Sequence, residues 1–177
     1  GNIAPDAGAA SARTLILDGT ASGTANGAIA DSGAVSLGIT KEGLGTWTLT
    51  AANTYTGAVT VSAGTLRVNS VGVSGSAQPL GAGTAVVTLG TATTTGTLDY
   101  SGNADATFGR GITVGGVAGG IVKNSGSGVL TLSGTITRAS RPFTFQGGAF
   151  NVTGQITGAS STLNVEGANV SLSQTTN

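Results

Sequence analysis

The chain contains no cysteine and no histidine, and only 8% of its 177 residues are charged. Without cysteine it forms no disulfide and no thiolate metal site, so a small extracellular protein of this composition needs another source of stability. Without histidine it lacks the commonest general base and any imidazole metal ligand. Ser-His catalysis and metal sites built on histidine or cysteine are therefore excluded.

Charge is as scarce as the reactive side chains are. Seven basic residues balance seven acidic ones, so the chain has no electrostatic footprint for a phosphate backbone, and we expect no nucleic-acid partner. So little surface charge predicts self-association. No apolar run reaches the length of a membrane span, and no signal sequence opens the chain. Because it begins at Gly1, we expect a mature protein after signal removal, with an excised segment of a longer protein as the alternative.

The chain is rich in glycine and poor in aromatic residues. It has 32 glycines and 4% aromatic residues, which leaves material for a thin, extended core rather than a thick globular one. The longest stretch without glycine, residues 135–146, contains Pro142 and many β-branched residues, so we expect essentially no helix.

Short segments of alternating apolar and polar residues fill most of the remaining sequence, and most end in Gly, Asn or Asp. That pattern predicts half-buried strands joined by tight corners. The strands are expected at residues 14–17, 34–37, 47–50, 59–62, 66–69, 85–89, 97–100, 112–114, 121–123, 129–133, 143–145, 150–153, 163–165 and 170–173, and residues 70–78 are the expected long loop.

The most distinctive segment is residues 41–69, KEGLGTWTLTAANTYTGAVTVSAGTLRVN. Within it Trp47 and Leu49 share one face of a strand, and threonines share the other. The segment resembles the passenger-associated transport repeat, also called the autotransporter-associated β-strand repeat. The positions that carry the resemblance are Gly45, Trp47, Leu49, Asn53, Thr54, Tyr55, Gly57, Val61, Gly64 and Leu66.

This resemblance implies a right-handed parallel β-helix at a bacterial surface or outside the cell, as in adhesins and other type V secreted proteins. It implies no catalytic residue and no cofactor. A second, degenerate copy is read at residues 123–133, which repeat the basic residue, the glycine and the strand. We therefore predict an all-β protein whose residues 1–177 form one β-solenoid domain. At about 20 to 25 residues a coil, it would make about seven to nine coils and a rod of about 35 to 45 Å.

A sandwich or jelly roll is the alternative all-β architecture, with neighbouring strands antiparallel. The last third of the chain favours such pairing locally. Residues 143–145 and 150–153 flank Gly147 and Gly148, and residues 163–165 and 170–172 flank Gly167, so both pairs have the pattern of a hairpin.

A few residues are candidates for chemistry. Asp99 and Asp105 are the closest pair of acids and would be the carboxylates of a polysaccharide-degrading enzyme, although their glycine and asparagine neighbours favour a role as turn residues. Residues 102–108 resemble one imperfect copy of a calcium-binding β-roll repeat, and a single copy cannot build a shared metal site. The paired glycines at 115–116 and 119–120 lack a phosphate-binding pattern and indicate a tight connection.

Other candidates concern binding. Trp47, Tyr55 and Tyr100 would form a stacking platform for sugars if exposed, but the phase of Trp47 with Leu49 favours packing in the core or at corners. Arg138 and Arg141 form the only basic cluster, which we expect in a solvated loop. Asn151 and Asn169 begin glycosylation sequons that matter only in a eukaryotic secretory pathway.

The ends of the chain show no capping element in the sequence. A solenoid's terminal coils expose unpaired backbone groups, so another copy stacked head to tail is the expected cover. The candidate assembly contacts are Asn2, Ile3, Val170 and Leu172, with strand exchange by residues 2–12 or by the tail 174–177. We therefore expect a secreted, non-catalytic fibre subunit or rigid spacer. The alternatives are an adhesin passenger that binds a host or carbohydrate ligand and, third, an enzyme.

Overall fold

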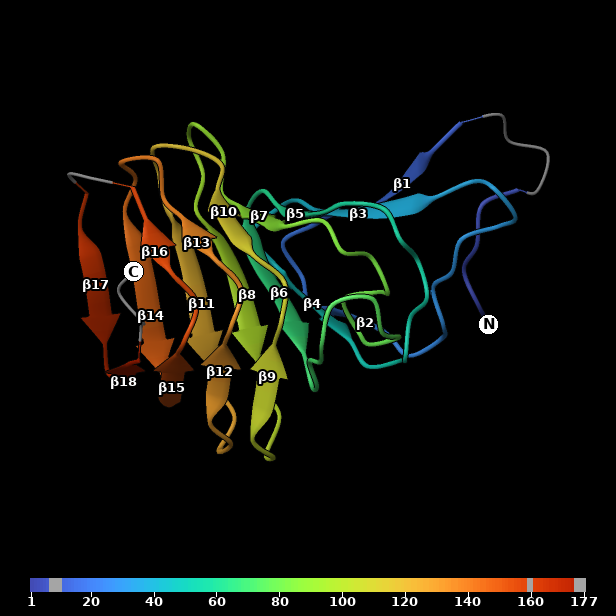
Figure 1. The fold of residues 1–177 in the computed structure, drawn as a ribbon. Coiled ribbons are helices and arrows are strands. Elements are labelled where there is room, and N and C mark those ends of the chain that lie inside the picture. Colours follow the sequence, from blue (N-terminus) through green and yellow to red (C-terminus); the bar gives the residue numbers. More distant parts are fainter. Residues whose placement is uncertain (7–10, 159–160, 174–177) are drawn as a thin grey trace.

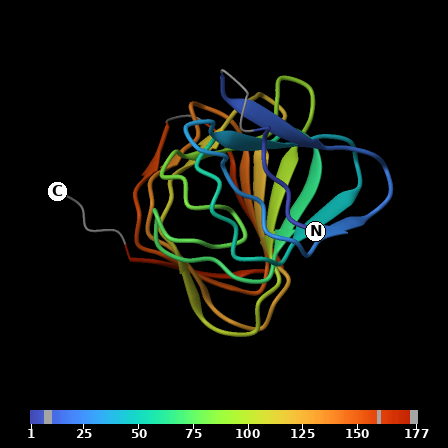
Figure 2. The same ribbon diagram turned by 90° about the vertical axis from the view of Figure 1, so that its right-hand side faces the viewer.

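The structure is a computed structural model that describes residues 1–6, 11–158 and 161–173. Figure 1 shows an elongated stack of strands, with the N-terminus at one end and the C-terminal strands at the other. Viewed along the stack, the chain winds repeatedly around a central core (Figure 2). Throughout the described ranges the regular structure is strand, with no helix.

One long side of the stack is a continuous sheet, here called sheet 1. All of its neighbouring strands are parallel. In spatial order the strands are β1 (Arg13–Leu17), β3 (Leu37–Lys41), β5 (Val59–Val61), β7 (Val87–Leu89), β10 (Ile112–Val114), β13 (Ile136–Thr137) and β16 (Ile156–Thr157).

Two further parallel sheets close the coil. Sheet 2 contains β2 (Gly23–Ala25), β4 (Thr46–Leu49), β6 (Gly64–Val68), β8 (Gly96–Tyr100), β11 (Gly120–Asn124), β14 (Phe143–Gly147) and β17 (Leu163–Glu166). Sheet 3 contains β9 (Ala106–Phe108), β12 (Leu130–Leu132), β15 (Ala149–Val152) and β18 (Asn169–Leu172). Because each turn adds one strand to sheet 1 and one to sheet 2, and from β9 onward one to sheet 3, the protein is a parallel β-solenoid of about seven turns, as predicted.

The coils differ in length, as the number of residues between paired positions on adjacent strands shows. Ile39 pairs with Val59, 20 residues later, whereas Gly64 pairs with Gly96, 32 residues later. Most of the extra residues of the longer coil lie in the connection between β6 and β7, which contains the expected loop at 70–78, and the rest lie between β7 and β8. Sequence repeats are degenerate for this reason, since each coil must match its neighbours only at the stacked strands.

The core is a thin column of inward-facing side chains. In sheet 1 the alternate residues Val59, Val61, Val87 and Leu89 have no exposed surface, and the threonine between each pair points outward. Near the C-terminal end the column contains a contact between the rings of Phe143 and Phe145, with centroids 5.1 Å apart. Each layer is covered only by the layers above and below it, which fits the small number of aromatic residues.

The third side of the coil changes along the stack. In the C-terminal half it is sheet 3, whose strands present Phe108, Leu132 and Val152 to the core. In the N-terminal half the described residues form no strand of this sheet, and buried Tyr55 and Leu80 fill the space from loops. The change falls at the long coil, between residues 69 and 106.

Two local expectations are wrong. The segments around Gly147 and Gly167 are not hairpins, because β14 and β17 lie in sheet 2 while β15 and β18 lie in sheet 3. Gly147 and Gly167 have φ values of 91° and 60°, and they turn the chain into the next sheet rather than back along the same one. The sandwich alternative is excluded as well, since every pair of named strands is parallel.

Some strand positions also differ from the prediction. The strand expected at 34–37 begins only at Leu37, because Val35 pairs with Ser32 in a separate antiparallel bridge. The short strands β2, β9, β13 and β16 were not expected from the sequence at all. They have two or three residues each, and each pairs with a strand of a neighbouring coil that supports its conformation.

The degenerate copy expected at 123–133 does not stack on residues 41–50. Lys41 ends a strand of sheet 1, whereas Lys123 lies in β11 of sheet 2. The similar residues therefore occupy different sides of the coil.

Candidate functional site: the repeat segment and the solenoid surfaces

Asn53 of the repeat segment links three successive coils on the third side of the solenoid. Its side chain is completely buried. Its Oδ1 accepts a hydrogen bond from the backbone N–H of Ile29 at 2.8 Å, and its Nδ2 donates to the carbonyl of Pro79 at 2.7 Å. This buried amide, with both ends paired, adds to the backbone hydrogen bonds between coils on this side, such as the one from the N–H of Asn53 to the carbonyl of Gln78.

Thr54 and Tyr55 continue the same contact. The backbone N–H of Thr54 donates to the carbonyl of Ile29 at 3.0 Å. Tyr55 is fully buried, and burial raises the pKa of its hydroxyl above the ordinary value. Its ring lies against Gly81, where an added Cβ would come within 2.6 Å of the ring.

The glycines of the segment mark places where coils approach too closely for a side chain. A Cβ on Gly57 would lie 2.5 Å from the carbonyl oxygen of Leu37 on the preceding coil. Gly45 and Gly64 stack at the corner between sheets 1 and 2, and Gly64 also has a φ of 62°. Leu49, Val61 and Leu66 fill the core with no exposed surface. The described contacts of the motif residues are thus contacts between coils.

Lys41 belongs to the same corner and has a structural role that was not expected from the sequence. It is fully buried, and its Nζ donates to the carbonyls of Glu42, of Gly43 at 2.9 Å and of Ala63 at 3.3 Å. Burial lowers the pKa of Lys41, although the nearby carboxylates of Asp18 and Glu42 oppose the shift. Lys41 points inward at the end of β3, where it is in register with the buried Val61. Its position in the alternating pattern of residues 37–41 is the signal that could have indicated its burial.

The three aromatic residues proposed as a platform are not together on the surface. Tyr55 and Tyr100 are buried, which confirms the packing interpretation for both. Trp47 is half-buried, packs over Gly23 of the preceding coil and donates from Nε1 to the carbonyl of Asp18 at 3.0 Å. Stacking of a sugar on a shared aromatic surface is therefore not supported by their positions.

The two acids proposed as a catalytic pair have separate structural partners. Asp99 forms an ion pair with Arg67, with Oδ2 2.8 Å from Nε. Asp105 accepts a hydrogen bond from the backbone N–H of Val129 at 2.7 Å. Each carboxylate thus holds a neighbouring coil, consistent with a structural rather than a catalytic role.

Neither metal nor phosphate binding gains support from the glycine-rich loops. Within the described ranges, no three His, Cys, Asp or Glu side chains are grouped so as to hold a metal ion. At Gly116 a Cβ would lie 1.6 Å from the carbonyl oxygen of Thr91, so this loop is the tight connection that was expected. None of the described residues lies in a helix long and apolar enough to cross a membrane.

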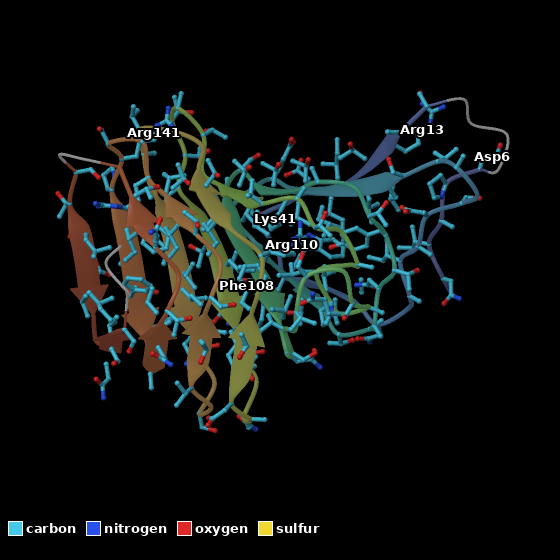
Figure 3. The ribbon with its side chains drawn as sticks, viewed as in Figure 1. Asp6, Arg13, Lys41, Phe108, Arg110 and Arg141 are labelled. Carbon is cyan, nitrogen blue, oxygen red and sulfur yellow. The ribbon has the colours of Figure 1, made fainter. Side chains whose placement is uncertain are left out.

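Arg138 and Arg141, which were expected in a solvated loop, form hydrogen bonds to neighbouring coils instead. Arg138 donates to the carbonyls of Gly158 and Ser161, each at 3.1 Å, on the following coil. Arg141 donates to the carbonyl of Val114 at 2.7 Å on the preceding coil. Both guanidinium groups therefore link neighbouring coils of the stack. Arg141 is labelled in Figure 3.

Outward-facing residues stack into regular rows. In sheet 1 six threonines are in register, one on each of six successive strands: Thr40, Thr60, Thr88, Thr113, Thr137 and Thr157. In sheet 2 the corresponding row contains four charged residues and one glutamine, and Asp99 within it is buried: Arg67, Asp99, Lys123, Gln146 and Glu166. The two faces thus differ in chemistry, one hydroxyl-rich and the other ionic. An open groove of about 310 Å³ lies over sheet 1 near the N-terminal end, and Arg13, Thr40 and Ala58 are among its lining residues.

The candidate assembly contacts lie at opposite ends. Ile3 pairs with Ile29, and the Oδ1 of Asn2 accepts a hydrogen bond from the backbone N–H of Ala28 at 3.3 Å. At the other end Leu172 is 56% exposed, and Val170 is half-buried. Residues 7–10 and the tail 174–177, for which strand exchange was expected, lie outside the described residues.

Comparison with known proteins identifies the repeat. The family model of the passenger-associated transport repeat matches residues 39–68. The chain is similar to the adhesin BmaC autotransporter of Brucella suis biovar 1 (strain 1330), with 36% identity over 127 residues. The alignment covers 70% of this chain and only 4% of that much longer relative. No solved structure gives a significant match.

Proposed function

Because residues 39–68 of this chain are a passenger-associated transport repeat, we propose that the chain is a non-catalytic segment of a β-solenoid passenger at a bacterial cell surface or secreted from it. The observation that carries the proposal is the use made of the repeat residues. Asn53, Tyr55 and Gly57 hold one coil on the next and leave no reactive group exposed. Such a segment supplies length and rigidity.

Within that passenger, the segment acts as a rigid spacer whose sides are available for adhesion. The stack presents the threonine row on one face, that of sheet 1, and the charged row on another face, that of sheet 2. An adhesin of this kind would bind a host or carbohydrate ligand on a side face, since the coil interior is filled. The similarity to an autotransporter named as an adhesin supports this form of the proposal.

The location is tested in the parent bacterium by inserting an epitope at Gly75, in the exposed loop between β6 and β7. Antibody should label intact cells or the culture supernatant as strongly as it labels lysed cells. Labelling only after lysis would contradict the proposal. A cytoplasmic protein with the same epitope serves as the control for cell integrity.

Adhesion is tested separately with the purified chain as a competitor of bacterial binding to host cells. The chain should reduce binding in a saturable manner, and Ala58→Arg, which fills the groove on sheet 1, should remove the effect if that face is used. Thr131→Arg on the outer face of sheet 3 is the matched control. Absence of competition by the unmodified chain would leave a spacer role without adhesion.

End-to-end assembly into a fibre is a second candidate function. Val165 and Leu172 are in register with the buried residues Phe145 and Val152, so they face the core, yet they are 52% and 56% exposed because the last described coil is uncovered. A head-to-tail joint would place β16 against β1 and β17 against β2, and it would bury these side chains.

Electron microscopy across a concentration series tests the fibre. Filaments with an axial repeat near the length of one chain are expected, and Leu172→Lys should abolish them. Ser171→Lys, which places the same charge on the outer face of the same strand, should leave them intact. Isolated rods at every concentration would rule out the fibre and leave the passenger proposal standing.

A further inference from the structure

The middle of the core contains a polar site that the stacking of coils does not explain. Arg110 lies inside the stack next to Phe108, with only 2% of its surface exposed (Figure 3). Its Nε donates to the carbonyl of Ala85 at 2.7 Å, and its Nη1 donates to the carbonyl of Leu80 at 2.8 Å. Its Nη2 is buried and has no hydrogen-bond partner.

Tyr55 supplies a second unpaired group in the same region. Its hydroxyl is buried and also has no partner. Both residues flank one short backbone segment, because Arg110 binds the carbonyl of Leu80 and the ring of Tyr55 lies against the next residue, Gly81. The positive charge of Arg110 also acts on Tyr55, opposing the effect of burial on its pKa.

Two unpaired polar groups in an apolar core are costly. A buried donor without a partner destabilises a folded protein, and buried polar groups are therefore almost always paired with protein atoms or with water. Isolated buried waters generally occupy sites of this kind, where several protein groups would otherwise remain unsatisfied.

We propose that Arg110 and Tyr55 together bind one internal water molecule. The water accepts a hydrogen bond from Nη2 of Arg110 and shares a second one with the hydroxyl of Tyr55. The carbonyl oxygens of Ala85 and Leu80 already pair two of the three guanidinium nitrogens, so one nitrogen is left for the ligand, and a single water satisfies it.

The site lies at the long coil, where loops on the third side give way to sheet 3. Tyr55 and Leu80 come from loops on the third side, and Arg110 follows β9, the first strand of sheet 3. The bound water thus completes the hydrogen bonding between two kinds of coil. This role does not depend on the proposed surface location or on adhesion.

A crystal structure of the full chain at atomic resolution, from crystals grown in a bromide salt, tests the proposal. The expected result is one spherical peak within about 3 Å of both Nη2 and the Tyr55 hydroxyl oxygen, without an anomalous bromine signal. An anomalous peak would show a halide site instead. A direct bond between the two side chains, or an empty site, would also overturn the proposal.

Oxygen-17 relaxation dispersion of water gives an independent count in solution. Arg110→Met should lose one long-lived internal water relative to the unmodified chain. Lys41→Met is the matched control, because Lys41 is equally buried but its ammonium group already has three carbonyl partners, so the count should not change. If Arg110→Met does not fold, Tyr55→Phe should show the same loss, and an unchanged count in that variant would overturn the proposal.

Discussion

Arg67 of β6 and Asp99 of β8 are paired neighbours on adjacent strands of sheet 2, at the two ends of the longest coil. They form an ion pair, with Nε and Oδ2 2.8 Å apart. The carboxylate has no exposed side-chain surface, whereas the arginine side chain is 40% exposed. The other carboxylate oxygen accepts a hydrogen bond from the backbone N–H of Ser125 on the following coil at 3.2 Å. One buried carboxylate therefore joins three coils across a connection of irregular length.

Removing the arginine should destabilise the protein more than an ordinary surface ion pair would. Arg67→Met leaves the buried carboxylate of Asp99 with only its hydrogen bond to Ser125, and we expect a loss of about 2 kcal/mol in the free energy of unfolding. A double-mutant cycle with Asp99→Asn, measured by urea denaturation, isolates the pair. Additive effects of the two substitutions would show that the ion pair contributes no coupling.

Asn53 should be among the most sensitive polar positions. Asn53→Asp removes the donor to Pro79 and places a buried carboxylate against the carbonyl of Pro79, so we expect about 3 kcal/mol of destabilisation at neutral pH. Asn103→Asp is the control, because Asn103 is exposed and contacts only Ser127 through its side chain. Equal effects in thermal denaturation would refute the role assigned to Asn53.

Gly57 and Gly72 form a matched pair for testing close approach between coils. An alanine Cβ at Gly57 would lie 2.5 Å from backbone atoms of residues 37 and 38, so the coils must separate, and Gly57→Ala should cost about 2 kcal/mol or more. An alanine Cβ at Gly72 meets nothing within 4 Å. Gly72→Ala should therefore be close to neutral in urea denaturation, and the opposite order would contradict the stacking.

Asp31 should make stability depend on acidic pH. Its carboxylate accepts hydrogen bonds from the hydroxyl of Thr56 at 2.6 Å and from the backbone N–H of Leu37 at 2.7 Å. Burial alone would raise the pKa of Asp31, but these bonds and the backbone N–H of Thr56 outweigh it, so the pKa in the folded state is lowered.

The direction in which stability changes with pH follows from the linkage between folding and proton binding. A carboxyl group whose pKa is lower in the folded state contributes its full stabilisation above its ordinary pKa and loses it as the pH falls through the lowered value. The unmodified chain should therefore exceed Asp31→Asn in stability at about pH 7, and the difference should shrink at about pH 2.5. Urea denaturation of both proteins at the two pH values provides the comparison, and a difference that stays constant would exclude the linkage.

Prediction from the sequence worked where strands were long enough to show a period. Ile112–Val114 was placed with its observed bounds, and Trp47–Thr50 differs by one residue at each end. It failed for the two-residue strand at Ile136, because two residues cannot define an alternating pattern. The buried roles of Lys41 and Arg110 were also missed, since charged side chains are rarely buried and a single sequence does not show which carbonyl groups will surround them.

The sequence by itself determined the architecture. Short alternating segments, glycine at the corners and the absence of helix-forming runs predict an all-β protein with a thin core, and the passenger-associated transport repeat within residues 41–69 predicts the parallel solenoid. Only the tertiary structure decided which coil lies on which. In the tertiary structure the two predicted hairpins are corners between sheets 2 and 3, and Arg67 pairs with Asp99, which follows it by 32 residues. Tyr55 and Arg110 both contact the segment formed by Leu80 and Gly81. The physical reason is that register is set by contacts between coils of unequal length, and those contacts exist only once the coils have stacked.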